Sequence, residues 1–244
     1  MIKKILIISG LSLLAGYLIF VAFFLENSPQ EKKCANFEII VDSGDDERFV
    51  DPVALEKTIN AKGLNPKGKY LKDVNTHTIQ EALLSNKLIK TAEVFITSGG
   101  GVRAVIKERI PVLRVMTSNG ENYYIDKDCS RMPLSNLNTS YLPLVTGDVK
   151  EEFAKTNLYK FALFLQNNDF WNSQIVQIVV HSEKNVGLIS RIGDQEILMG
   201  GLDNFEEKLD RLETFYAKVL SKTGWNRYST LNLKYDKQVV ATKH

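Results

Sequence analysis

The segment from Leu88 to Val115, LIKTAEVFITSGGGVRAVIKERIPVLRV, decides the fold of the first half of the chain. Residues 92–96 (AEVFI) are typical of a strand, and three consecutive glycines at 99–101 favour a turn. From Val102 to Ile106, apolar side chains recur at every second position, as they do in a strand with one buried face. The segment therefore predicts two strands joined by a hairpin turn.

The residues before this hairpin predict a strand followed by two helices. Residues 37–41 (FEIIV) are typical of a strand. Asp51 followed by Pro52 favours a helix start, because the carboxylate accepts hydrogen bonds from free N–H groups and proline suits the first helical position. Thr78 and Glu81 stand at capping-box spacing and indicate the start of a second helix. One domain is therefore expected at residues 37–114, in the order strand, helix, helix, strand, strand.

The residues after Pro111 change character and predict a second, β-rich domain. The dipeptide Asn119-Gly120 lies between two apolar runs and favours a hairpin turn. From Asp203 onward, apolar residues repeat at helical steps, and a final extended stretch runs from Tyr228 to Ala241. The chain is therefore predicted to be α+β, with a mixed sheet domain at residues 115–244 that ends in an edge strand.

The N-terminus predicts a membrane anchor. The run from Ile5 to Leu25 holds no charged residue, and its 21 residues would form a helix about 31 Å long, close to the thickness of a bilayer core. A cleaved secretory signal is the alternative, but this run is longer than usual and lacks a small-x-small exit. Lys3 and Lys4 favour a cytoplasmic tail at residues 1–4. Residues 26–36 are then a linker to an ectodomain outside the cytoplasm.

Composition narrows the classes of function. Lys and Arg total 31 and Asp and Glu total 29, so the net charge of +2 argues against nucleic-acid binding. Without Lys3 and Lys4 the charge is 2 − 2 = 0, which gives no reason to expect binding to anionic lipid. Three scattered histidines and two cysteines argue against a metal site. Cys34 and Cys129 are compatible with either a disulfide or two free thiols.

No motif for catalysis is visible in the sequence. The glycines at 99–101 are not followed by the Lys-Ser/Thr of a phosphate-binding loop, and no G-x-S-x-G elbow occurs. We therefore expect a protein that is not an enzyme and that has no cofactor and no small-molecule substrate.

Five short motifs occur along the chain: Ala92-Glu93-Val94, Glu108-Arg109-Ile110-Pro111, Tyr123-Tyr124-Ile125-Asp126, Leu142-Pro143-Leu144-Val145-Thr146-Gly147 and Leu231-Asn232-Leu233-Lys234-Tyr235. In this order they resemble the bacterial cell-division proteins FtsQ and DivIB. The first half, residues 37–114, resembles a POTRA (polypeptide-transport-associated) domain. Three positions depart from the family pattern: Cys129 stands where glycine is usual, Asn232 stands where aspartate is usual, and Lys234 replaces the usual arginine.

The resemblance implies a non-catalytic scaffold of the inner membrane that is enriched at the division septum. Its implied partners are FtsB-like and FtsL-like division proteins, and its last strand is the implied docking edge for the FtsB-like one. An exposed edge offers unpaired N–H and C=O groups to a second extended chain. Residues 236–238 are expected to form a bulge or tight turn before the outermost pairing segment. The partner-binding residues expected on this basis are Lys234, Tyr235, Asp236, Val239, Val240 and Ala241.

Two other functions compete with this one. The first is a single-span POTRA protein of another envelope assembly or secretion pathway, although such proteins usually carry several POTRA units or a following barrel. The second is an anchored envelope enzyme, which the missing nucleophile motifs disfavour.

Overall fold

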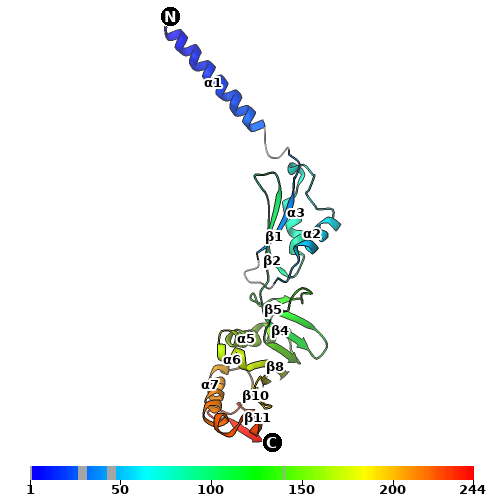
Figure 1. Cartoon of the computed structure of the whole chain (residues 1–244), viewed down its shortest axis with the longest axis vertical. Coiled ribbons are helices and arrows are strands. Elements are labelled where there is room, and N and C mark those ends of the chain that lie inside the picture. The colour runs from blue at the N-terminus through cyan, green and yellow to red at the C-terminus, as the bar shows by residue number, and fades with distance from the viewer. Residues whose placement is uncertain (1, 27–31, 43–47, 140) are drawn as a thin grey trace. The chain divides into compact units, whose positions relative to one another are not determined.

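The computed structural model describes residues 2–26, 32–42, 48–139 and 141–244. Contacts divide the chain into two units, Met1–Glu108 and Arg109–His244 (Figure 1). The boundary lies six residues before the one expected after residue 114, because the strand Pro111–Thr117 pairs with strands of the second unit.

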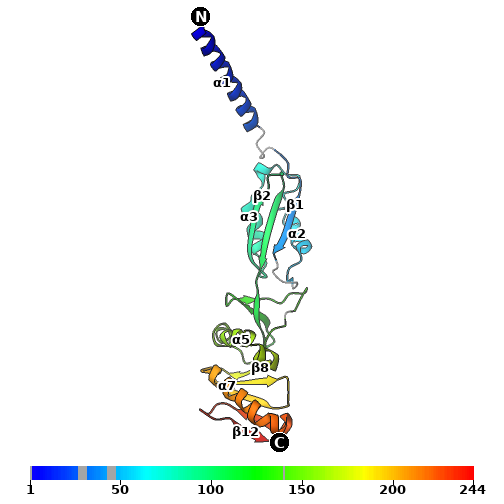
Figure 2. The same ribbon diagram turned by 60° about the vertical axis from the view of Figure 1, so that its left-hand side comes forward.

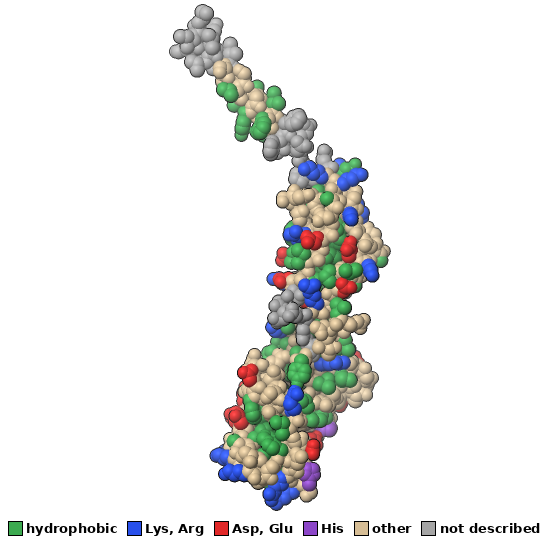
Figure 3. Space-filling model, viewed as in Figure 1, with side chains coloured by type: hydrophobic (Ala, Val, Ile, Leu, Met, Phe, Trp, Pro, Cys, Tyr) green, Lys and Arg blue, Asp and Glu red, His purple; other side chains and the backbone are tan. Residues whose placement is uncertain are grey.

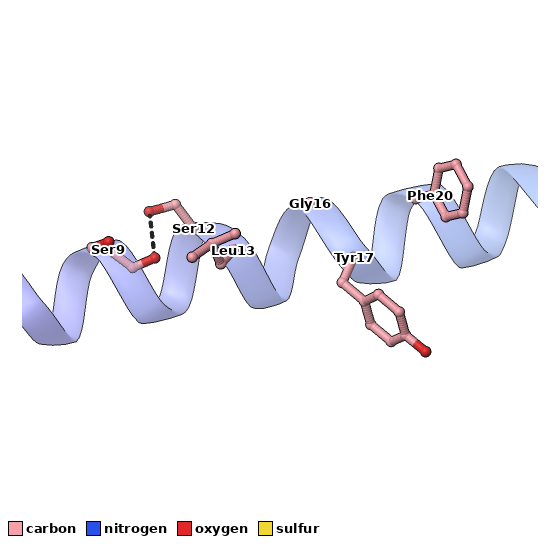
Figure 4. A pocket seen from close by; sticks show the side chains of 6 residues that line it. All are labelled: Ser9, Ser12, Leu13, Gly16, Tyr17 and Phe20. Atoms are coloured by element: carbon pink, nitrogen blue, oxygen red, sulfur yellow. Dashed lines mark hydrogen bonds between the residues drawn. The ribbon is translucent and has the colours of Figure 1, made fainter.

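The first element is the helix α1, Ile2–Glu26. Figure 4 shows six side chains along its middle, where Ser12 Oγ donates a hydrogen bond to the carbonyl of Ser9 at 3.3 Å. Tyr17 is 65% exposed. The predicted span from Ile5 to Leu25 is not confirmed, since no helix in the described part of the chain is both long enough and apolar enough to cross a membrane.

The rest of unit 1 has the predicted order of elements around a three-stranded sheet. The strands lie in the order β1-β3-β2, with β1 parallel and β2 antiparallel to β3. Helix α2 contacts β1, and α3 contacts β2. Figure 2 shows the sheet from a second direction. The elements are β1 (Phe37–Asp42), α2 (Pro52–Ala61), the 3-10 helix η2 (Leu71–Asp73), α3 (Thr76–Leu84), β2 (Ile89–Ile96) and β3 (Val102–Glu108).

Local capping explains where the two helices of this sheet domain begin. Asp51 accepts a hydrogen bond from Val53 N at 2.9 Å, and Pro52 occupies the first turn, as predicted. The second helix also begins where it was expected, between residues 75 and 78, but its cap is Asn75 and not Thr78: the Asn75 side chain accepts from Thr78 N at 3.1 Å. Asn75 competes successfully because asparagine is at least as good a cap as threonine.

Unit 2 is built on a nine-stranded mixed sheet in the order β12-β11-β10-β9-β8-β7-β4-β5-β6. The Asn119-Gly120 turn joins β4 to β5, as predicted. The strands are β4 (Pro111–Thr117), β5 (Asn122–Asp126), β6 (Arg131–Met132), β7 (Leu144–Gly147), β8 (Ile175–Ser182), β9 (Asn185–Ser190), β10 (Glu196–Gly200), β11 (Tyr228–Asn232) and β12 (Val240–Lys243). The helices are α4 (Glu151–Phe153), the π-helix η3 (Ala154–Leu158), α5 (Tyr159–Gln166), α6 (Asp169–Gln174), α7 (Phe205–Phe215), the π-helix η4 (Tyr216–Leu220), α8 (Ser221–Thr223) and the 3-10 helix η5 (Trp225–Arg227).

The helices bury one face of this sheet. Ile178, Leu188 and Leu231 come from neighbouring strands and are fully buried in a cluster that also holds Phe161 of α5 and Leu209 of α7. The neighbours of these residues on the same strands are partly or fully exposed except Gly187, as in an antiparallel sheet with one solvated face. The core of unit 2 thus lies on one face of the sheet. At one edge of the sheet, β12 has no further strand beside it among the described residues.

The Glu108-Arg109 pair ends one unit and begins the next, and each side chain has a structural partner within its own unit. The Glu108 carboxylate is 8% exposed and accepts hydrogen bonds from Phe49 N at 2.9 Å and Val50 N at 2.6 Å. Arg109 Nη1 donates to the buried carboxylate of Asp126 at 2.6 Å. The pair therefore fixes the segment before α2 and the end of β5, which accounts for its place in the sequence motif.

Glu108 makes the stability of unit 1 depend on pH. Burial raises its pKa above the ordinary 4.5, against the opposing effect of the two backbone N–H groups and of Arg48. The folded state therefore binds this proton at a pH at which the unfolded chain has released it. The part of the stability of unit 1 that comes from this bound proton is fully present below pH 4.5. It is lost as the pH rises through the pKa of Glu108 in the folded state.

Glu108→Gln is expected to remove this dependence while it keeps an oxygen that accepts hydrogen bonds. Hydrogen exchange of the β3 amides in the full chain reports the opening of unit 1, since both tryptophans, Trp171 and Trp225, lie in unit 2. As the pH rises from 4.5, the free energy of opening of the wild type should decrease relative to that of the variant. A difference that stays constant with pH would contradict the assignment.

Candidate partner-binding site

The end of the chain forms a β-hairpin, and its turn falls within residues 236–238, where the sequence predicted a bulge or tight turn. Strands β11 and β12 pair antiparallel, with Leu231 opposite Ala241 and Asn232 opposite Val240. A turn at Asp236 and Lys237 reverses the chain, and Lys237 has a left-handed φ of 61°. Without a glycine at the left-handed position, the sequence left a bulge and a tight turn as alternatives, and the structure has the turn.

The hairpin places β12 at the edge of the nine-stranded sheet. One side of β12 pairs with β11, and no described strand pairs with its other side. Leu231 and Leu233 are fully buried, and Leu233 N donates to the carbonyl of Leu198 at 2.9 Å, which holds the connection against β10. The edge is therefore attached firmly on its inner side and offers backbone groups on its outer side.

The six residues expected from the sequence do not form one cluster. Val239 and Ala241 pack against the core of unit 2, whereas Val240, 41% exposed, lies between them in the alternation of the strand. Tyr235 is 53% exposed and precedes the exposed Asp236 at the turn. The side chain of Lys234 reaches β9, where its Nζ donates a hydrogen bond to Asn185 Oδ1 at 3.0 Å. The structure thus assembles the edge strand and the turn and leaves Lys234 apart from them.

A groove of about 370 Å³ lies beside the edge, between the last turns of α7–η4 and the chain that leads into β12. Phe215, Val219 and Val239 are half-buried and give it apolar surface. Its lining is completed by Asp210, Arg211, Thr214, Lys218, Lys237 and Gln238. This groove was not predicted from the sequence. One signal for it was Phe215, an apolar residue that lies outside the apolar stripe of the helix.

The charges of the groove are mainly positive. Arg211, Lys218 and Lys237 line it against the single carboxylate of Asp210. Arg211 Nη2 donates to the carbonyl of Leu233 at 3.3 Å, which places its side chain at the base of the hairpin connection. Lys208, one turn earlier, donates instead to the carbonyls of Met199 and Gly201, and burial lowers its pKa. Figure 3 shows Lys and Arg side chains at this end of unit 2.

Edge and groove together are suited to binding an extended peptide. The edge offers a row of backbone donors and acceptors, and the groove accommodates an apolar side chain beside a carboxylate. Among the described residues, no group of three or more His, Cys, Asp or Glu side chains is placed to hold a metal ion. Cys34 and Cys129 are both free thiols in the structure.

Fold and site define a class: a POTRA-like domain followed by a mixed-sheet domain with an open C-terminal edge. A family model described as "FtsQ/DivIB, C-terminal related" matches residues 110–242, more than half of the chain. A POTRA-like domain model matches residues 32–107. The chain belongs to the FtsQ/DivIB-related family, as the sequence motifs predicted. A search of curated proteins finds no match.

Proposed function

We propose that this protein is a non-catalytic scaffold of the bacterial division machinery that binds FtsB-like and FtsL-like partners at the septum. The family supports a role associated with cell division. The observation that carries the proposal is the unpaired edge of β12 beside an apolar, positively charged groove. An added partner strand satisfies the edge, and the groove selects the partner by shape and charge.

The proposal includes an anchor in the cytoplasmic membrane through residues 5–25, with the ectodomain on the outer side. Its support is the sequence: 21 uncharged residues follow Lys3 and Lys4. Division partners that are themselves small single-span proteins would then meet the ectodomain close to the membrane. The anchor keeps the scaffold on the surface where its partners lie, which raises their effective concentration without any further contact.

The site residues favour recognition over catalysis. The edge and groove offer mainly backbone N–H and C=O groups, apolar side chains and cations, beside the carboxylate of Asp210 and the polar side chains of Thr214 and Gln238. Such groups bind and orient a peptide, whereas catalysis needs a nucleophile or an acid–base pair in contact with the reacting atoms. The role of each residue in the site is therefore to contact a partner.

Imaging of a fluorescent fusion in dividing cells tests the proposed function. We expect a band at midcell that appears as constriction begins. An even signal around the envelope in dividing cells would contradict the septal role and favour a POTRA protein of another envelope pathway. A fusion of the same expression level that carries only residues 1–36 is the control, since a band from that piece would show that the folded units are not needed.

A further inference from the structure

Five exposed lysines lie on two hydrogen-bonded segments of unit 1 that also carry one exposed aromatic ring. They are Lys32, Lys33, Lys67, Lys69 and Lys72, and the ring is that of Tyr70. We call this surface the lysine patch. Figure 3 shows Lys and Arg side chains close together at the upper end of the unit. The net charge of the ectodomain is zero and conceals this local excess.

Backbone hydrogen bonds join the two segments that supply the patch. Leu71 N donates to the carbonyl of Lys32 at 2.9 Å, and Cys34 N donates to the carbonyl of Lys69 at 2.7 Å. Lys33 and Tyr70 form an isolated antiparallel bridge. Cys34 and Leu71 are buried beneath, at 2% and 1% exposure. Residues 32–36, which the sequence assigned to the linker, therefore belong to a built surface.

Among the five lysines, Lys69 Nζ donates to the carbonyl of Gly63 at 2.9 Å, and none is neutralised by a described carboxylate. In the part of the chain that the structure describes, no carboxylate lies within ion-pair distance of any of the five ammonium groups. Asp73 is the only acidic residue in the segments 32–37 and 67–73. The ammonium groups of Lys33 and Lys72 lie 5.5 and 5.7 Å from the centre of the Tyr70 ring, which is 46% exposed. Cations around an amphipathic ring are typical of a surface that meets lipid headgroups.

The position of the patch in the chain identifies its occupant. Lys32 follows Leu25, the end of the uncharged segment, by seven residues, which span at most about 25 Å when fully extended. We propose that the lysine patch binds the anionic phospholipid headgroups of the membrane in which residues 5–25 are anchored. This inference rests on the anchor included in the proposed function. Headgroup binding would hold the POTRA-like domain at the membrane surface.

The test uses the full chain in lipid nanodiscs and measures the reactivity of each lysine with an amine-labelling ester by mass spectrometry. One set of discs holds phosphatidylcholine alone, and the other holds one part phosphatidylglycerol to two parts phosphatidylcholine. In the anionic discs, the reactivity of Lys33, Lys67 and Lys72 should fall at least about threefold, because headgroup phosphates occupy the ammonium groups. Salt at about 1 M, with a screening length of about 3 Å, should restore it.

Matched variants separate the patch from general charge effects. Lys33→Gln, Lys67→Gln and Lys72→Gln combined should abolish the lipid-dependent protection of Lys32 and Lys69. Lys57→Gln, Lys87→Gln and Lys107→Gln combined remove the same charge from exposed positions elsewhere in unit 1 and should leave that protection intact. Equal reactivity in both kinds of disc would contradict headgroup binding by the lysine patch and would leave the proposed membrane anchor unaffected. A chain that does not enter the discs would overturn the anchor and, with it, this inference.

Discussion

Proline at one of the two positions 240 and 241 is expected to abolish capture of an FtsB-like partner while unit 2 stays folded. Successive N–H groups of a strand point to opposite sides, so one of Val240 and Ala241 donates toward β11 and the other toward the open side. Proline removes the donor and blocks the approach of a pairing strand. At the open side this leaves a partner carbonyl unsatisfied, at a cost of about 1–3 kcal/mol, or roughly 5–150-fold in Kd.

The two variants, Val240→Pro and Ala241→Pro, serve as controls for each other. The variant that removes the inward donor should lower the thermal unfolding temperature, because it breaks the β11–β12 ladder. The other should unfold near the wild-type temperature and fail to retain the partner in a pull-down. If both variants remain folded and both retain the partner at wild-type affinity, partner binding does not use the β12 edge.

Gly147→Ala is expected to destabilise unit 2 by about 3–5 kcal/mol. Gly147 has a φ of 108°, and a Cβ at this position would lie 2.1 Å from the carbonyl oxygen of Val180. That oxygen already accepts a hydrogen bond from Asp148 N at 2.8 Å, and Gly147 pairs with Val180 in the parallel β7–β8 register. The clash is between backbone groups, so no side-chain rotation relieves it.

Gly120→Ala is the matched control for this prediction. Gly120 also has a left-handed φ, 91°, but an added Cβ would meet nothing within 4 Å. It should therefore cost only backbone strain, about 1–2 kcal/mol. Urea unfolding followed by the fluorescence of the buried Trp171 measures both variants. Equal losses of stability would show that the sheet yields at β7–β8 and that close approach does not explain the glycine.

The sequence predicted those elements of the fold that depend on residues close together in the chain. The strand alternation from Val102 to Ile106 and the glycines at 99–101 specify the β2–β3 hairpin within a few residues, and Asp51-Pro52 specifies the start of α2. It was insufficient where partners are distant. The alternation in β4 does not reveal that this strand pairs with β7, about thirty residues away, and the unit boundary was placed too late for that reason.

In the candidate site, too, the sequence predicted the local feature and missed those that bring distant residues together. Its edge strand was expected in nearly the right residues, because an apolar run at Val239–Ala241 follows a polar stretch. The groove was missed because Phe215 and Val239 meet only after the chain has folded through α8, η5 and β11. The contact of Lys234 with Asn185 was also missed, since it joins residues that are distant in sequence.

Hydrogen exchange of the full chain, with and without the FtsB-like partner, tests the central claim most directly. We predict that partner binding protects the amides of Val240–Lys243 strongly, since an added strand engages their outward groups and shields the edge. Amides near Phe215 and Val219 should gain weaker protection as the groove is covered. Bound partner with unchanged exchange at Val240–Lys243, and protection confined to other strands or to unit 1, would contradict the account.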